Sequence, residues 1–158
     1  MTDASHHSLT VQSEEETGEL ARAIAGVVQT GDIIALHGEL GAGKTAFARA
    51  FIAALGGDGE TPSPTFTLVQ VYELPDHEVY HFDLYRLEKP DDVIELGIED
   101  AFADGVSLIE WPERMGSYLP WTRLDIMISN GAGDQERKIV IEDHDMMNER
   151  LDQLELDD

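Results

Sequence analysis

The chain has 158 residues, which suits one ordinary domain over residues 1–158, and it has no cysteine, which excludes disulfide frameworks and thiolate metal sites. Its 33 acidic residues outnumber the 10 basic ones and give a formal net charge of −23. With so few cationic side chains, direct binding to the phosphates of nucleic acid is disfavoured. No stretch approaches the roughly 18 consecutive apolar residues of a membrane span, and the polar N-terminus lacks the apolar middle of a signal peptide, so we expect a cytoplasmic protein with no membrane contact.

The first predicted element is an amphipathic helix. A capping box at residues 13–16, Ser-Glu-Glu-Glu, opens it. Its apolar face consists of residues at helical spacing: Leu20, Ala21, Ile24, Val27 and Val28. We expect this helix to end near Thr30.

A strand, a glycine-rich loop and a second helix follow. Residues 33–37 are apolar and β-rich, and a helical pattern follows the loop until Gly56. The loop, residues 38–45, reads GELGAGKT and matches G-x-x-x-x-G-K-[ST] in the strand-to-helix context that this phosphate-binding motif requires. Its glycines let backbone N–H groups surround an anion, Lys44 adds a positive charge, and the Thr45 hydroxyl suits Mg²⁺.

The rest of the chain alternates turns with short apolar segments. Two hairpins are predicted, one from residues 66–74 and 79–85 and the other from residues 123–129 and 137–142. Between them we expect a short helix at 91–96 and a strand at 106–110, and after them an acidic helix over 143–158. This order predicts a three-layer α/β P-loop domain, with a mostly parallel core sheet and antiparallel hairpin extensions.

A P-loop site also needs a carboxylate at the end of a neighbouring strand to hold the metal. Two residues qualify, because Glu110 closes the strand 106–110 and Asp83 interrupts the strand 79–85. Trp111 is either a stacking aromatic or a core residue. His81 is expected to be a strand residue with a local hydrogen bond, and the segment 63–66 is either a nucleotide-sensing loop or a rigid turn.

Five motifs together resemble the TsaE family, formerly called YjeE. They are GELGAGKT at 38–45, SPTF at 63–66, HFDLYRL at 81–87, ELGIED at 95–100 and LIEWPE at 108–113. The resemblance runs from about residue 13 to residue 142, and the acidic tail lies outside it. The chain departs from the family in two ways. Glu39 stands where Asp is usual, and the chain is more acidic. Its acidity fits adaptation to a salty cytoplasm as well as it fits an acidic protein of a mesophile.

The resemblance implies an ATPase that works with the TsaB and TsaD proteins in making threonylcarbamoyladenosine on tRNA. In that family the chemistry on tRNA belongs to TsaD, and the ATPase is a weakly hydrolysing switch. The protein would therefore bind ATP and Mg²⁺, take the TsaB–TsaD complex as its partner, and reach tRNA only indirectly.

The resemblance also implies the role of each site residue. The phosphates would be wrapped by Leu40, Gly41, Ala42, Gly43, Lys44 and Thr45. Thr45 and Glu110 would coordinate Mg²⁺, and Asp83 would lie near the γ-phosphate as the catalytic partner of Lys44. The adenosine would be enclosed by Glu14 and Thr17 of the first helix and by the segment Gly133 to Arg137.

Two other functions use the same loop. A small-molecule kinase would need an acceptor pocket and usually a basic lid, for which seven scattered Arg offer little. A non-catalytic ATP-binding adaptor differs from the switch only in whether hydrolysis matters. A GTPase is excluded, because the sequence has no N/T-K-x-D motif to recognise guanine.

Overall fold

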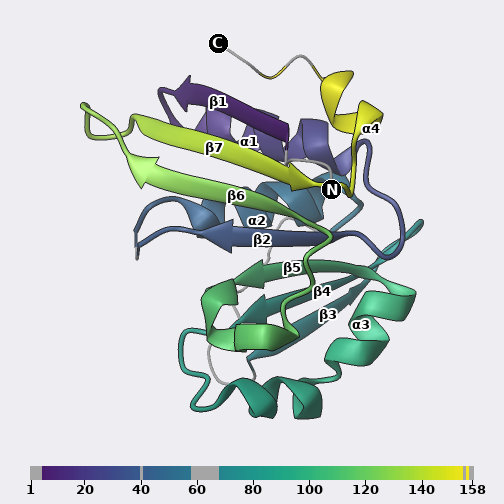
Figure 1. Cartoon of the computed structure of the whole chain (residues 1–158). Helices are drawn as coiled ribbons and strands as arrows, with labels where there is room; N and C mark the ends of the chain where they lie inside the picture. The colour runs from purple at the N-terminus through teal and green to yellow at the C-terminus, as the bar shows by residue number, and fades with distance from the viewer. Residues whose placement is uncertain (1–4, 40, 58–67, 155, 157–158) are drawn as a thin grey trace.

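The computed structural model describes residues 5–39, 41–57, 68–154 and 156. Their strands form one sheet in the order β1-β7-β6-β2-β5-β4-β3 (Figure 1). The four central strands run parallel, and antiparallel partners flank them on both sides. The predicted parallel core with hairpin extensions is therefore confirmed. The strands are Ser5–Val11 (β1), Ile33–His37 (β2), Val69–Glu73 (β3), Glu78–Asp83 (β4), Val106–Glu110 (β5), Arg123–Asn130 (β6) and Arg137–His144 (β7).

Helices cover both faces of this sheet, so the predicted three-layer α/β class is confirmed. On one face α1 and α2 pack against each other, and on the other face η1, η2 and α3 lie beside β4, β5 and β2 (Figure 1). No helix within the described residues has the length and apolarity that crossing a membrane requires. The helices are Glu14–Ala25 (α1), Lys44–Ala54 (α2), Pro90–Leu96 (η1), Ile98–Asp104 (α3), Pro112–Tyr118 (η2) and Glu149–Asp152 (α4).

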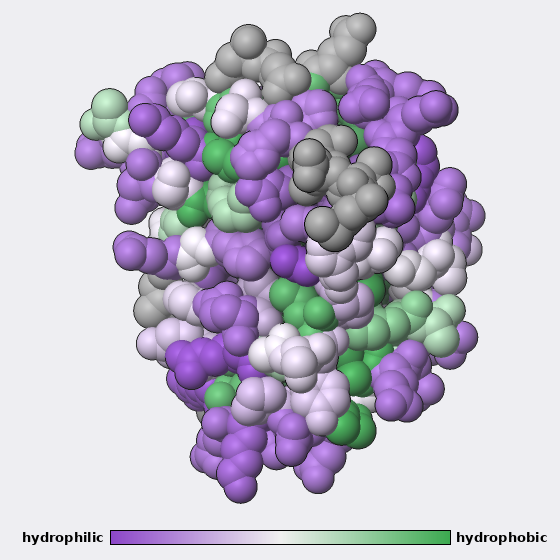
Figure 2. Space-filling model, in the orientation of Figure 1, coloured by the Kyte–Doolittle hydropathy of each residue, from purple (hydrophilic) through white to green (hydrophobic). Residues whose placement is uncertain are grey.

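The central strand β2 is buried on both faces, which explains its unbroken apolar sequence. Ile34 and Leu36 pack with Phe47 and Phe51 of α2, whereas Ile33 packs on the other face with Phe82 of β4. Alternate side chains of one strand thus hold the two helical layers to the sheet. Outside this core, hydrophilic residues cover most of the face in Figure 2, as the charged composition predicts.

The first helix begins as predicted but ends earlier. The Ser13 hydroxyl caps it by accepting the N–H of Glu16 at 3.2 Å. The expected end near Thr30 is wrong, because α1 ends at Ala25 and Gly26 caps it. The turn that follows is stabilised by Asp32, whose carboxylate accepts the N–H of Gln29 at 2.8 Å.

Three elements were not predicted. The strand β1 is polar, and its place in the sheet comes from pairing with β7, in which Ser5 faces Asp143 and Val11 faces Arg137. The helix α3 and the 3-10 helix η2 follow Gly97 and Trp111, both of which have left-handed backbone conformations. Such short elements have little periodicity of their own, and their packing against the sheet stabilises them.

The predicted acidic helix over 143–158 is wrong for most of its length. Strand β7 continues to His144, and the later helix α4 covers only Glu149–Asp152. The carboxylate of Asp143 accepts the backbone N–H groups of Met147 at 3.0 Å and Asn148 at 2.6 Å, so the chain turns sharply after the strand. Met147 and Leu151 are buried in the core.

Candidate functional site

Glycines in the loop between β2 and α2 have the positive φ values from which an anion-binding nest can be built. Gly38 and Gly43 have φ values of 153° and 111°. A Cβ atom on Gly38 would lie 2.6 Å from the carbonyl oxygen of Ile128, so glycine is required there. Gly43 directly precedes α2, whose first N–H groups and dipole favour an anion at this end.

Lys44 is buried at the start of α2 and lies over the loop. Its side chain is 5% exposed, its Nζ donates to the carbonyl of Gly38 at 2.6 Å, and the same atom lies 3.5 Å from the ring centroid of Trp111. Burial lowers the pKa of Lys44, although the charges of Glu110, Asp83 and Glu113 act to raise it. The ammonium is thus held among the loop, an aromatic face and carboxylates.

The two candidate metal carboxylates lie next to each other. Asp83 ends β4 and Glu110 ends β5, and the two residues are direct partners in the parallel pairing of these strands. Burial raises the pKa of Asp83, and the negative charge of Glu110 raises it further. The N–H of Tyr85, which donates to Asp83 Oδ1 at 3.2 Å, acts to lower this pKa. The Thr45 side chain is exposed in the first turn of α2. The structure therefore offers hard oxygen ligands of the kind that Mg²⁺ prefers.

His81 contacts this pair in a way that the sequence analysis missed. Its Nε2 lies 2.7 Å from Oε2 of Glu110, a residue 29 positions away, and both side chains are buried. The expected local hydrogen bond is therefore wrong. The spacing His81-x-Asp83 was an available signal, because alternate strand residues point to the same face of the sheet.

Trp111 occupies a strained position at the edge of the site. Its φ of 59° is in the left-handed region that non-glycine residues rarely adopt. The ring is half-buried between the ammonium of Lys44 and the ring of Tyr85, whose centroid lies 5.0 Å away. Of the two alternatives, the stacking aromatic describes this arrangement better than a core tryptophan does.

A hollow of about 470 Å³ adjoins the loop, a volume within the range of small-molecule sites. Arg137 lines it and anchors the β6–β7 connection to the loop, because its Nε donates to the carbonyl of Ala42 at 3.0 Å. The hollow thus brings together the start of α1, the loop and the second hairpin, as the resemblance implied. It is lined by Ser13, Glu14, Glu15, Thr17, Gly41, Gly43, Ala46, Gln135 and Arg137.

Some predicted residues are not brought to this hollow. Gly133 is exposed and is not among its lining residues, whereas Glu15, which was not predicted, and Gln135, which was predicted only as part of the segment 133–137, are. Leu40 and the segment 63–66 lie outside the described residues. Gln135 falls within the predicted segment 133–137, so its loop position was the signal available in the sequence.

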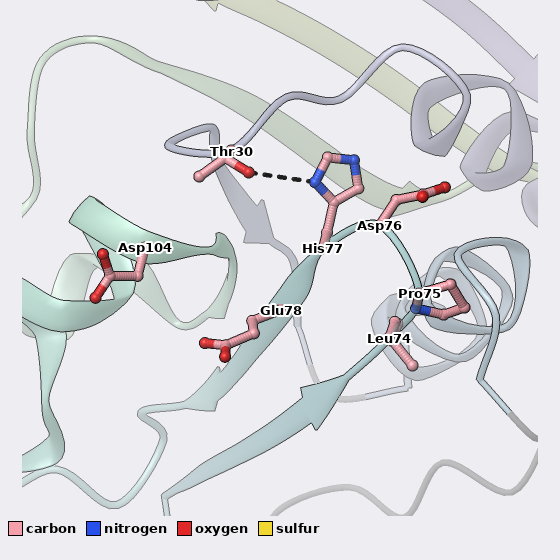
Figure 3. Close-up of a pocket in the computed structure, with 7 residues that line it drawn as sticks. All are labelled: Thr30, Leu74, Pro75, Asp76, His77, Glu78 and Asp104. Carbon is pink, nitrogen blue, oxygen red and sulfur yellow. Dashed lines mark hydrogen bonds between the residues drawn. The ribbon is translucent and has the colours of Figure 1, made fainter.

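A second hollow, of about 360 Å³, lies where the chain passes from β3 to β4, at the end of β4 opposite Asp83. Figure 3 shows its lining residues. Three carboxylates line it, those of Asp76, Glu78 and Asp104, together with the contact of 3.4 Å between Thr30 Oγ1 and His77 Nδ1. These negative charges oppose the binding of phosphates. The end of the sheet that carries the loop 38–45 is therefore the better candidate for binding a nucleotide.

Comparisons with known proteins find relatives over most of the chain. The family model described as "Threonylcarbamoyl adenosine biosynthesis protein TsaE" matches residues 11–139. The chain is 41% identical over 117 residues to a "tRNA threonylcarbamoyladenosine biosynthesis protein TsaE" of Rickettsia bellii, covering 73% of the chain and 81% of the relative. It is 41% identical over 126 residues to the Bacillus subtilis protein of that name, covering 79% and 78%. The crystal structure of Bacillus subtilis YdiB matches 98% of the chain and 97% of its own length at a TM-score of 0.78 and 29% identity.

Proposed function

Because the chain belongs to the TsaE family, we propose that it serves tRNA threonylcarbamoyladenosine biosynthesis as a switch that binds ATP, hydrolyses it weakly and supports the TsaB–TsaD complex. One observation carries this proposal. The buried ammonium of Lys44 lies at the start of α2, and the charges of Asp83 and Glu110, which end two adjacent parallel strands, act on it. That combination suits a nucleoside triphosphate with its metal.

The phosphates would occupy the loop in front of α2. The positive φ of Gly41 and Gly43 supports a backbone that directs its N–H groups inward. Lys44 now donates to a carbonyl of its own loop, and a phosphate oxygen is a stronger acceptor for the same donor because both partners are charged. Binding would therefore replace a hydrogen bond to a neutral carbonyl with one between two charged groups.

The residues present fit a magnesium ion. Thr45 offers a hydroxyl in the first turn of α2, and Glu110 offers a carboxylate at the end of β5, both of them the oxygen ligands that this ion takes. When bound, the ion would neutralise charge on the phosphates. Asp83, beside Glu110 and half-buried, would orient the attacking water at the γ-phosphate.

The adenosine would enter the hollow beside the loop. Glu14 and Thr17 line it from α1 and Arg137 from β7. Because Arg137 also bonds to the carbonyl of Ala42, occupation of the hollow is coupled to the loop that holds the phosphates. A switch needs such a connection between the nucleotide and a neighbouring surface element.

The partner would supply the contact with tRNA. A net charge of −23 opposes direct binding of a phosphate backbone, so we place the RNA on TsaB–TsaD and this protein beside them in the cytoplasm. Residues 1–158 would act as one domain.

A pull-down tests this proposal. Immobilised protein should retain purified TsaB and TsaD with Mg-ATP and release them without nucleotide, and K44A should lose the nucleotide effect. Retention that is equal with and without ATP would overturn the switch. If binding required ATP while modification continued without hydrolysis, the protein would be a non-catalytic adaptor.

A further inference from the structure

We propose that His81 is a positioning residue that holds the Glu110 carboxylate in the orientation that the metal requires. This inference rests on the proposed function, in which Glu110 takes part in binding the ion of Mg-ATP. The observation that carries it is the contact of 2.7 Å between His81 Nε2 and Glu110 Oε2. Both residues are almost fully buried, at 1% and 4% exposure.

The direction of this hydrogen bond follows from its chemistry. An ionised carboxylate accepts hydrogen bonds and cannot donate them, so the ring must carry its hydrogen on Nε2. Within the described residues this is the one hydrogen bond that the Glu110 carboxylate makes. Its oxygen Oε2 is therefore engaged, and Oε1 is left to serve the ion or a water bound to it.

The backbone makes this arrangement rigid. His81 lies in the middle of β4, where it is the register partner of Leu108, two residues before Glu110 in β5. His81 and Asp83 occupy alternate positions, so both point to the face of the sheet that carries α2. One strand thus presents the positioning ring and the second carboxylate side by side.

Lys44 gives Glu110 a competing partner. The ammonium is buried near both carboxylates, and Glu110 is the one that acts on it more strongly. Without His81, the Glu110 carboxylate would be able to rotate toward this cation. Ligating carboxylates are commonly held by such outer hydrogen bonds, whose loss costs about 10- to 100-fold in metal affinity.

A buried histidine can also serve packing alone, and the experiment must separate the two roles. Mn²⁺ replaces Mg²⁺ as a paramagnetic probe, and its binding to the protein–ATP complex is titrated by electron paramagnetic resonance. The affinity for ATP without divalent metal is measured in parallel by calorimetry. The variants are H81A, H81N and H81Q, because the glutamine amide can reach the position of Nε2 whereas the shorter asparagine amide cannot.

The control is H77A. His77 lies directly before β4, at the opposite end of that strand from Asp83, and its Nδ1 lies 3.4 Å from Thr30 Oγ1. We expect H81A and H81N to weaken Mn²⁺ binding about tenfold or more, with metal-free ATP affinity within about twofold. H81Q should restore most of the metal affinity, and H77A should keep all of it.

The outcomes separate this inference from the function on which it rests. If the unmodified protein bound no Mn²⁺ with ATP, the proposed function and this inference would both fall. If it bound Mn²⁺ and H81A and H81N bound it equally well, this inference alone would fall. Should H81A not fold, the comparison of H81Q with H81N decides, since a structural role would not make metal affinity depend on the reach of the amide.

Discussion

Asp83 and Glu110 are direct register partners at the point where the parallel strands β4 and β5 both end. Their surroundings nevertheless differ. Asp83 accepts the N–H of Tyr85 in a turn, whereas Glu110 accepts a hydrogen bond from buried His81. Two carboxylates with different partners suit the two proposed roles, water activation for Asp83 and metal binding for Glu110.

Replacing Asp83 by Asn should separate binding from hydrolysis. A residue that orients water adds little to ground-state binding, so we expect near-normal ATP affinity and hydrolysis reduced by about 10²-fold. ATP turnover and tRNA modification are measured in a reconstituted mixture with TsaB and TsaD. Asp76→Asn, at the exposed turn of the opposite hollow, is the control. Normal turnover by the Asp83 variant would assign hydrolysis to another residue.

Replacing Lys44 by Ala should weaken ATP strongly. The change removes a charge-assisted phosphate contact of about 1.5 to 3 kcal/mol, or one to two decades in affinity. Calorimetry with ATP and with ADP measures the loss. The exposed Lys89 provides the control, and Lys89→Ala should bind as the unmodified protein does. Equal affinity of the two variants would place the nucleotide elsewhere.

Arg137→Ala should weaken ATP and ADP by the same factor. Arg137 lines the hollow and bonds to the loop carbonyl of Ala42, and neither contact depends on the γ-phosphate. Loss of a hydrogen bond from a charged group costs about 1.5 to 3 kcal/mol. Lys138→Ala removes the next charge along β7 from an exposed position and should change neither affinity. A loss confined to ATP would contradict the adenosine assignment.

Asp125 should make stability depend on pH at the acid end. Burial alone would raise its pKa, but hydrogen bonds from His37 and Arg123 and their positive charges outweigh burial and lower the pKa to about 2. The folded pKa lies below the ordinary value of 3.8. The stabilisation is therefore fully present above about pH 4 and is lost as pH falls toward 2, with a size of about 2 kcal/mol.

Urea unfolding of Asp125→Asn and of the unmodified protein tests this dependence. The difference in free energy of unfolding between them should shrink by about 2 kcal/mol from pH 5 to pH 2. Effects of the total charge are common to both proteins and cancel in the difference. Asp134→Asn, at an exposed loop position, should show no such change. A constant difference for Asp125 would mean that its partners do not hold the carboxylate ionised.

The predictions that held rest on local patterns. The motif at residues 38–45 contains its own glycines, its lysine and the start of its helix, so the strand–loop–helix arrangement can be predicted without knowing the rest of the fold. The two hairpins were predictable for the same reason, because a turn and alternating strands are neighbours in sequence. The strand-end positions of Glu110 and Asp83 followed from these elements.

The tertiary structure decided the contacts between distant segments. The polar strand β1 has no strong pattern of its own and becomes a strand by pairing with β7, more than a hundred residues later. The hydrogen bond of His81 to Glu110 depends on which strands are neighbours and on their register, and the hollow lined by Glu14 and Arg137 depends on packing of α1 beside the loop. Local propensity encodes neither, because register and burial are properties of the assembled sheet.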